Sequence, residues 1–441
     1  MLLQPRKGSS QLPPGPSAPA AVNTAVFVRR PLETLTTWQR RYGDFFTVGF
    51  LVFGTGVNVA DPAAIKELFT GDQSDLRAGE ANEPLSPIVG SHSVLTLDGP
   101  EHMRQRKLLL PPFQGSAVHA FRKIIREVSE REVAGWAPGS KLVLRDRMRS
   151  LTFEVICRAV FGVTERERVE RLRLALLPIM DTGVGVIFMP RALRRELGGF
   201  GPWGRLQRRL RAADALLYEE IERRRTASDL EARSDVLSLL LRARDEEGRP
   251  MSPRELRDEL MTMLAAGHET TATGLAFAFD LLLRNPEKLS RLREELASGG
   301  DAYLNATVTE SLRLRPVIDA SERTLTKPRT LGGFELPPGI RVYPAIALVH
   351  RREDLYPQAD EFRPERFLDD GAESYSWLPF GGGIRRCIGA ALAQAEMAEV
   401  IRCVVSRVEL EPIRTEPEPI VLRGITLAPR HGTPVRVASV A

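Results

Sequence analysis

The amino-acid sequence predicts a mainly α-helical protein with a minor β portion, and three observations support this prediction. Apolar residues recur at helical spacing, with charged residues between them, over residues 118–136, 144–175 and 205–225. A longer stretch with the same character runs from Ser252 to Arg284 without a helix breaker. Short strand-like pieces, separated by Gly-Gly and Pro-Pro-Gly turns, come late in the chain, within 329–348, 420–429 and 433–440.

Length and composition favour one large domain. The 441 residues suffice for one large core or two ordinary domains, and no interior linker separates two. We therefore expect a single domain over residues 26–441, preceded by a flexible segment rich in Pro, Ser and Gly over residues 1–25. The net charge of +5 is compatible with a basic patch and does not indicate a nucleic-acid partner.

The cysteine usage points to a reducing compartment. Cys157, Cys387 and Cys403 are too few and too widely spaced for a disulfide framework. The lack of a CxxC pair also disfavours a cysteine-rich zinc site. No apolar stretch is long enough to span a membrane, and the N-terminus lacks a signal-peptide pattern. We expect a cytoplasmic protein without a transmembrane anchor.

The most clearly delimited element is a long helix that starts after Ser252. Ser252 as N-cap, Pro253 at the first position and Glu255 at the third form a capping box. The pattern then continues for about 32 residues, which corresponds to roughly 48 Å of helix. Its middle is apolar on nearly every face, so this helix should run buried through the centre of the protein.

Polar and small residues interrupt this apolar helix at "AAGHETT", residues 265–271. A buried carboxylate such as that of Glu269 costs free energy unless it is paired. One interpretation is a helix-packing notch with a satisfied polar pair. The other is a surface of small residues on which a flat ligand lies, with Glu269 and Thr270 managing protons beside it.

A second motif, "ESLRLRP", places Glu310 and Arg313 one helical turn apart, just before Pro316 ends the helix. Farther on, "FRPERF" carries Arg366. We expect Glu310, Arg313 and Arg366 to form a cluster that pins this loop to the helix. Such a role is structural, not catalytic.

Cys387 occupies an unusual setting in "FGGGIRRCIGAALAQAE", residues 380–396. Glycines on both sides remove side chains from its surroundings, and a strong helix pattern begins at Gly389. Backbone N–H groups at a helix start favour a thiolate, and Arg385 and Arg386 add positive charge. A buried structural cysteine is the alternative, but the glycines and arginines favour a reactive or ligating thiolate.

These pieces together resemble one known family. Phe380, Gly383, Arg385, Cys387 and Gly389 reproduce F-x-x-G-x-R-x-C-x-G, the haem-binding signature of the cytochrome P450 family. "AGHETT", the Glu-x-x-Arg pair and "FRPERF" stand in the family's order, and "GPEHMRQRKLLLPPF" (99–113) resembles its helix beside the haem propionates. The resemblance spans roughly residue 30 to the end. It implies a helix-rich lobe and a small β-rich lobe, with haem b between the long central helix and the cysteine loop.

The resemblance also implies roles for individual residues. Cys387 would be the axial metal ligand, because a thiolate donates electron density that favours O–O cleavage. Glu269 and Thr270 would be the catalytic acid–alcohol pair that supplies protons at the oxygen site. His268 would face away. The other implied cofactor-binding residues are His102, Arg106, Ala266, Gly267, Arg323, Phe380, Gly383, Arg385 and Gly389.

The function implied by the resemblance is that of a monooxygenase, which inserts one oxygen atom of O2 into a lipophilic small molecule. Electrons from NAD(P)H would arrive through a ferredoxin or flavodoxin with its reductase. "PERF" and "LLLPPF" resemble the fatty-acid-hydroxylating branch, so a fatty acid is the first expectation and a terpenoid the second. Asp319 is a polar exception in a pocket expected to be lined by Leu85, Ile88, Val89, Ile187, Phe188, Leu264, Val317, Ile318 and Ile425.

Other functions remain open within this resemblance. A peroxide-driven enzyme or a haem isomerase shares the fold, but such relatives commonly lack the acid–alcohol pair. A non-catalytic haem-binding or sensor protein would share the thiolate ligand and has no need of Glu269 and Thr270. The acid–alcohol pair therefore favours the monooxygenase over these alternatives.

Overall fold

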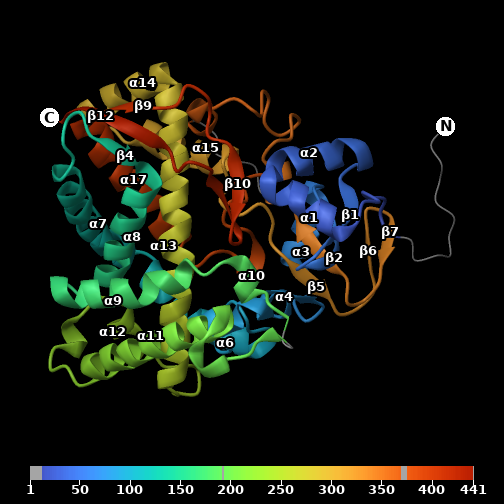
Figure 1. Cartoon of the computed structure of the whole chain (residues 1–441), viewed down its shortest axis with the longest axis horizontal. Coiled ribbons are helices and arrows are strands. Elements are labelled where there is room, and N and C mark those ends of the chain that lie inside the picture. The colour runs from blue at the N-terminus through green and yellow to red at the C-terminus, as the bar shows by residue number, and fades with distance from the viewer. Residues whose placement is uncertain (1–11, 191–192, 369–374, 441) are drawn as a thin grey trace.

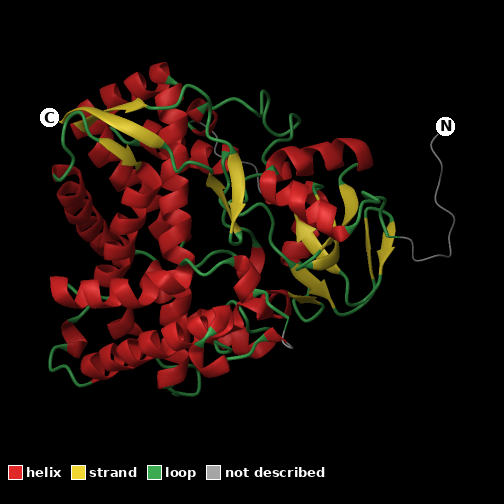
Figure 2. Ribbon diagram, viewed as in Figure 1, coloured by secondary structure: helices red, strands yellow, loops and turns green. Residues whose placement is uncertain are grey.

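The computed structural model describes residues 12–190, 193–368 and 375–440, and it has two lobes of unequal size. A large lobe of helices fills one side, and a smaller lobe built around a mixed sheet fills the other (Figure 1 and Figure 2). The predicted fold class, mainly α with a minor β portion, is confirmed.

The central element is α13 (Pro253–Arg284), which runs the height of the helical lobe in Figure 1. It contains 32 residues and begins with the predicted capping box, in which Ser252 and Glu255 bond each other's backbone amides. Helices α8 (Leu144–Ala159), α11 (Gly201–Arg225), α15 (Ala302–Leu314) and α17 (Ala390–Arg407) pack around it. This packing explains why α13 is apolar on nearly every face.

The remaining helices complete the two lobes. The longer ones are α1 (Ala20–Arg29), α2 (Pro31–Tyr42), α3 (Pro62–Thr70), α6 (Gly99–Leu109), α7 (Ser116–Ala134), α9 (Arg166–Met180) and α14 (Pro286–Ala297). The short ones are α4 (Ala78–Asn82), α5 (Ser86–Val89), α10 (Val184–Ile187), α12 (Val236–Arg242) and α16 (Ile346–Val349).

A five-stranded sheet forms the small lobe, in the order β1-β2-β8-β5-β3. Its strands are β1 (Phe45–Phe50), β2 (Gly54–Val59), β8 (Arg341–Pro344), β5 (Arg323–Leu325) and β3 (Leu76–Arg77). Strands β2 and β8 are parallel, whereas the other neighbours are antiparallel. Val57, Val342 and Leu68 share one buried apolar cluster, which joins the sheet to α3.

Three smaller sheets use the late strand-like segments. Strands β6 (Arg329–Leu331) and β7 (Phe334–Leu336) form a hairpin, as do β10 (Ile420–Arg423) and β11 (Thr426–Pro429). Strand β12 (Pro434–Val440) lies between β4 (Lys141–Val143) and β9 (Val408–Pro412). Segments 420–429 and 433–440 are both strands as predicted, but they belong to different sheets.

Two local predictions need correction. The helical pattern over 144–175 is not one helix, because α8 ends at Ala159 and α9 begins at Arg166. Gly162 lies between them with a φ of +63°, a left-handed conformation that ends the helical path of the chain. A Cβ at this position would lie 2.5 Å from the carboxyl carbon of Asp235, so the turn requires glycine. The last part of the predicted strand region 329–348 is also helical, within α16.

The N-terminal residues that the structure describes lie against the small lobe. Residues 1–11 lie outside the described part of the chain. From residue 12 onward the chain packs on the small lobe, where Thr47 donates hydrogen bonds to the carbonyls of Pro13 (2.7 Å) and Pro14 (3.1 Å). Helix α1 then begins at Ala20. Residues 13 and 14 therefore contact β1, and residues 20–25 belong to α1, whereas the expected boundary between a flexible segment and the domain at residue 25 stays a prediction.

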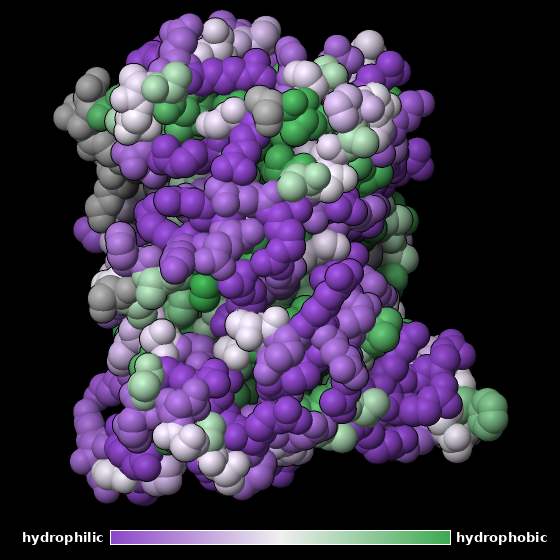
Figure 3. Space-filling view, turned by 90° about the vertical axis from the view of Figure 1, so that its left-hand side faces the viewer, coloured by the Kyte–Doolittle hydropathy of each residue, from purple (hydrophilic) through white to green (hydrophobic). Residues whose placement is uncertain are grey.

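The exterior shows mixed polarity. The face turned toward the viewer in Figure 3 is mainly hydrophilic, with small hydrophobic areas between. Among the described helices, none combines the length and apolar character that crossing a membrane requires.

Candidate functional site

A cavity of about 930 Å³ lies between α13, the loop before α17 and the sheet of the small lobe. Its wall is mostly apolar, with a few charged and polar groups from distant parts of the chain. Cys387 and Thr270, separated by more than a hundred residues, both line it. The structure therefore brings together the two motifs that the sequence singled out independently.

Cys387 lies on a loop whose conformation is set by the backbone. Its amide donates a hydrogen bond to the carbonyl of Phe380 at 2.9 Å, which closes the loop before α17 begins. The side chain is exposed to the cavity, not to the outer surface. Burial raises the pKa of the thiol, while the Gly389 amide and the charges of Arg386 and Arg106 oppose this rise. The sulfur thus points into an internal space with groups that favour a thiolate nearby.

The glycines of this loop serve different purposes. Gly383 has a φ of +61°, and a Cβ there would lie 1.8 Å from the carbonyl oxygen of Phe69 on α3. It does not line the cavity, so the expectation that Gly383 clears space beside Cys387 needs correction: it seats the loop against α3. Gly389 does line the cavity, and a Cβ there would meet nothing within 4 Å.

Four basic side chains converge on one end of the cavity: His102, Arg106, Arg323 and Arg385. Burial lowers the pKa of both Arg323 and Arg385 to about 10, and their mutual repulsion contributes at Arg323. The pKa of His102 falls to about 3, mainly through burial and secondarily through these arginines, so His102 is neutral.

These arginines are only partly neutralised within the chain. Arg385 pairs with Asp98 at 2.5 Å, whereas Arg323 lies over the ring of Phe69 at 5.6 Å. The Nε atoms of Arg323 and Arg385 have no hydrogen-bond partner among the described residues. This concentration of buried positive charge suits an anionic ligand, such as a pair of carboxylates.

The opposite wall is the middle of α13. Ala266 and Thr270 face the cavity one turn apart, and the Thr270 hydroxyl donates to the Ala266 carbonyl at 2.5 Å. Two arginines of α8 form ion pairs with Glu269. Arg145 donates a hydrogen bond to Oε1, and Nε of Arg149 lies 2.8 Å from Oε2. Arg149 also bonds Asp181 at 2.6 Å, near the exterior. A chain of polar groups therefore leads from the surface to Glu269, beside Thr270.

Gly267 and His268 both contact helix α8, and Gly267 also belongs to the cavity wall. A Cβ on Gly267 would lie 3.3 Å from Ile156, so this glycine allows close approach of the two helices. His268 is fully buried with its ring edge-on to Phe153, and burial lowers its pKa to about 3. It does not line the cavity, in agreement with its expected direction.

The predicted Glu310–Arg313–Arg366 cluster is assembled in the structure. Glu310 and Arg313 are fully buried and joined by two bonds of 2.6 and 2.8 Å, and Arg366 lies 3.4 Å from Glu310. Arg313 also donates to the carbonyls of His350 and Ala359, and Glu310 accepts from the Arg363 amide. The cluster thus ties α15 to the segments that precede the Cys387 loop.

Eight of the nine predicted substrate-pocket residues line the cavity: Leu85, Ile88, Val89, Ile187, Phe188, Val317, Ile318 and Ile425. Leu264 does not; it is fully buried in the helical core. The lining positions of α13 are instead 259, 262, 263, 265–267 and 269–271. Met263 lies seven residues, or about two helical turns, before Thr270 and therefore on the same face of α13. Counting back from Thr270 in the sequence would have predicted Met263 in place of Leu264.

Several polar residues of the cavity wall were not predicted from the sequence. Glu259 and Thr262 come from α13, and Asn58 and Tyr343 face each other as paired residues of β2 and β8. Nothing in their local sequence distinguishes Asn58 or Tyr343 from other strand residues, so their place in the cavity follows from the sheet topology.

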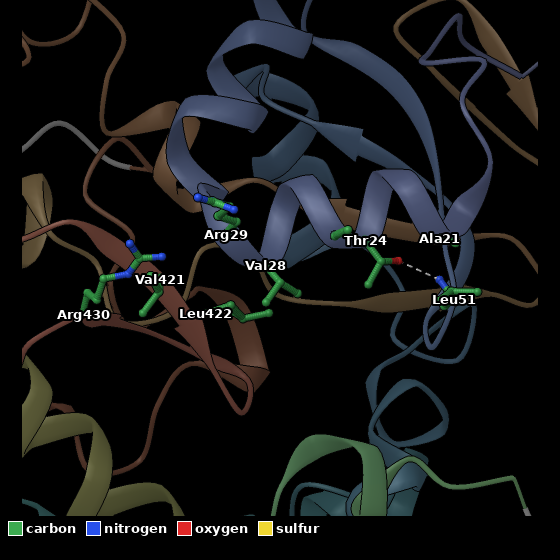
Figure 4. A pocket seen from close by; sticks show the side chains of 9 residues that line it. Ala21, Thr24, Val28, Arg29, Leu51, Val421, Leu422 and Arg430 are labelled. Carbon is green, nitrogen blue, oxygen red and sulfur yellow. Dashed lines mark hydrogen bonds between the residues drawn. The ribbon is translucent and has the colours of Figure 1, made fainter.

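A second hollow, of about 530 Å³, lies on the outer surface between α1 and β10 (Figure 4). Val28, Leu51 and Leu422 form its apolar floor, with Arg29 and Arg430 at one end. It is open to solvent and lined by ordinary surface side chains, so we do not assign it a function.

Comparison with known proteins agrees with this geometry. Residues 13–434 match the model of the family described as Cytochrome P450. A Mycobacterium tuberculosis protein named "Putative cytochrome P450 135B1" is 41% identical over 438 residues, covering 97% of this chain and 92% of the relative. "Putative cytochrome P450 137" of the same species is 38% identical over 431 residues, with 96% and 90% covered.

Solved structures share the fold. "Retinoic acid bound cyanobacterial CYP120A1" matches with a TM-score of 0.85 at 24% identity, covering 98% of this chain and all of the other. "Crystal structure of cytochrome P450DA heme domain" matches with a TM-score of 0.86 at 24% identity, with 97% of each covered.

The chain belongs to the cytochrome P450 family and is a haem-dependent monooxygenase. Members of the cytochrome P450 family bind haem b and use O2 together with reducing equivalents from a partner. The residues present fit this cofactor: a thiol faces the cavity, Gly389 leaves open space beside it, and incompletely neutralised arginines suit two carboxylates.

Proposed function

We propose that this cytochrome P450 oxidises a lipophilic small molecule in the cavity between Cys387 and Thr270. The observation that supports this most directly is the shared cavity, with a thiol on one wall and the acid–alcohol pair on the other. Haem, when bound, supplies the iron at which O2 is activated. The thiolate of Cys387 would bind its iron, and its propionates would be held by His102, Arg106, Arg323 and Arg385.

We propose that Thr270 and Glu269 deliver protons to the oxygen site. The Thr270 hydroxyl is anchored to the Ala266 carbonyl and, after rotation, can donate into the cavity. Arg145 and Arg149 fix the position of the Glu269 carboxylate, and Arg149 links it to Asp181 near the surface. Protons from solvent would follow this line of polar groups to Thr270.

The apolar wall supports a lipophilic substrate, with a fatty acid as first candidate and a terpenoid as second. Asp319 is the acidic group beside Val317 and Ile318, and burial raises its pKa to about 6. It would therefore carry a negative charge at neutral pH, which disfavours a carboxylate close to this part of the wall.

The family requires an external electron source, and we propose a ferredoxin or flavodoxin. Arg386 is exposed next to Cys387, and its charge already acts on the thiol. Arg122 and Arg126 belong to α7, which packs against α17, the helix that follows the cysteine loop, and because both pair with the single carboxylate of Glu399 this group keeps one net positive charge. Positive charge on this side of the sulfur suits the docking of an acidic carrier.

The proposal is tested by the ferrous–CO difference spectrum of the purified protein. The wild type should give the strongly red-shifted Soret band of thiolate-ligated haem, and Cys387→Ala should lose it. Cys403→Ala, which removes another thiol of the same region from α17, is the matched control and should keep it. A thiolate spectrum in Cys387→Ala would contradict the ligand assignment.

A second measurement separates turnover from mere binding. With O2, NAD(P)H and a ferredoxin–reductase pair, substrate-dependent O2 consumption is expected. A haem sensor would show the thiolate spectrum without such consumption, and a peroxide-driven enzyme would form product from hydrogen peroxide while ignoring NAD(P)H.

A further inference from the structure

Six acidic residues line the large cavity within the described part of the chain. Three of them form ion pairs with arginines: Asp181, Glu269 and Glu322. Two others are buried, each with an unpaired oxygen atom that is closed to solvent: Glu259 and Glu396. Asp319 differs from all five, because it is partly exposed and no cationic side chain among the described residues acts on it.

The carboxylate of Asp319 is open to the cavity. The residue is partly exposed, and its neighbours Ile318 and Ala320 line the same wall. No described side chain donates a hydrogen bond to the carboxylate, and its oxygens are not among the unpaired atoms that are closed to solvent. A ligand in the cavity can therefore reach them, in contrast to the unpaired oxygen of Glu259.

Backbone hydrogen bonds hold this segment of the wall in place. The Val317 carbonyl accepts from the Leu427 amide at 2.8 Å, and the Asp319 carbonyl accepts from the Ala347 amide at 2.9 Å. The Ser321 amide donates to the end of β8 at 3.2 Å. Because the main chain is fixed on both sides of Asp319, the position of its carboxylate is largely set before a ligand binds.

The surroundings of Asp319 suit a positive charge. Burial raises the pKa of Asp319 to about 6, against the lowering effect of the backbone amides of residues 319 and 320, so the group is charged at neutral pH. Burial also raises the pKa of Tyr343, and the charges of Glu322 and Asp319 raise it further, which places this aromatic residue close to the carboxylate. A carboxylate near an aromatic ring in a mostly apolar cavity is a setting that favours a cation.

We propose that the carboxylate of Asp319 binds a protonated or quaternary amine carried by an otherwise lipophilic substrate. The inference deepens the proposed monooxygenase function and rests on it. The ligand would supply the counter-charge that the described residues do not provide, while the apolar wall takes the rest of the molecule. The same charge repels a carboxylate, so a lipophilic amine is a better occupant of this part of the cavity than a fatty-acid anion.

The test uses three probes with the same ten-carbon chain, decyltrimethylammonium, 1-decanol and decanoate, titrated into the haem-loaded enzyme by calorimetry. The quaternary nitrogen has no lone pair, so this probe cannot bind iron. Asp319→Asn keeps the size of the side chain and removes its charge, and it should weaken binding of the ammonium probe about tenfold. Affinity for 1-decanol should change by less than about twofold, and decanoate should bind more tightly.

Two controls separate charge recognition from a change in structure. Asp319→Glu keeps the charge and should retain most of the affinity for the ammonium probe. Asp146→Asn removes an exposed acid outside the cavity and should leave all three affinities unchanged.

The inference is overturned if the wild type does not bind the ammonium probe. It is also overturned if Asp319→Asn leaves this affinity unchanged or weakens all three probes equally. Failure of the proposed function would instead appear as a wild type without the thiolate CO spectrum.

Discussion

The two walls of the cavity are built in different ways. The wall that carries Cys387 depends on backbone geometry: Gly383 lets the loop approach the Phe69 carbonyl, and the Cys387 amide closes on Phe380. The α13 wall depends on side chains from other elements, as when Arg145 and Arg149 hold Glu269. Changes on the cysteine side should therefore disturb cofactor binding, and changes on the α13 side should disturb the reaction or substrate choice.

The largest effect is expected at Gly383. Gly383→Ala places a Cβ at a φ of +61° and 1.8 Å from the Phe69 carbonyl oxygen, so the loop must move away from α3. We expect most of the protein to purify without haem, measured as the ratio of Soret to protein absorbance. Gly135→Ala, at the C-cap of α7 and without such a clash, should keep normal haem content. Normal haem content in Gly383→Ala would show that side-chain contacts, not backbone fit, hold the loop.

The second prediction concerns Glu310, which belongs to the buried cluster that joins α15 to the segments preceding the Cys387 loop. Glu310→Ala leaves Arg313 fully buried without its carboxylate, which costs about 3–5 kcal/mol for a buried pair. Denaturant unfolding of the haem-loaded protein should show this loss. Glu222→Ala, which breaks an exposed ion pair with Arg225, should change stability by less than about 0.5 kcal/mol. A stable, haem-loaded but inactive Glu310→Ala would assign Glu310 to catalysis.

The same contrast explains what could be predicted from the sequence. The cysteine loop could be recognised from consecutive residues of the sequence. Its backbone requires glycine where φ is positive or another backbone comes close, as at Gly383, and binding of a metal ion requires the thiol of Cys387. Likewise the capping box at Ser252 fixed the start of α13. The arginines that hold Glu269 and the pairing of Asn58 with Tyr343 arise from contacts between distant segments, for which one sequence offers no pattern. Leu264 was chosen because α13 is apolar on nearly every side, whereas counting two helical turns back from Thr270 identifies Met263 as the lining residue.

On the α13 wall, Thr270→Ala should separate catalysis from cofactor binding. The substitution removes the hydroxyl that we propose delivers protons, while its helical neighbours stay in place. The thiolate CO spectrum should be unchanged, and hydrogen peroxide formed per NAD(P)H should rise several-fold at the expense of product. Thr309→Ala, on α15 and away from the cavity, is the control. Unchanged product per NAD(P)H in Thr270→Ala would remove Thr270 from the proton path.

The smallest effect concerns stability against pH at Asp319, on the wall of the small lobe. Burial raises its pKa from 3.8 to about 6, so the folded protein holds a proton that the unfolded chain releases. This carboxyl therefore destabilises the fold progressively as pH rises from about 4 to 6, and by a constant amount above. Asp319→Asn should accordingly be more stable than the wild type at pH 7.5, by up to about 3 kcal/mol, and nearly equal to it near pH 4. Denaturant unfolding at both pH values measures the difference, with the exposed Asp146→Asn as control. A variant less stable than the wild type at pH 7.5 would mean that the Asp319 charge has a stabilising partner, and that this part of the wall is built, like the α13 side, on an ion pair.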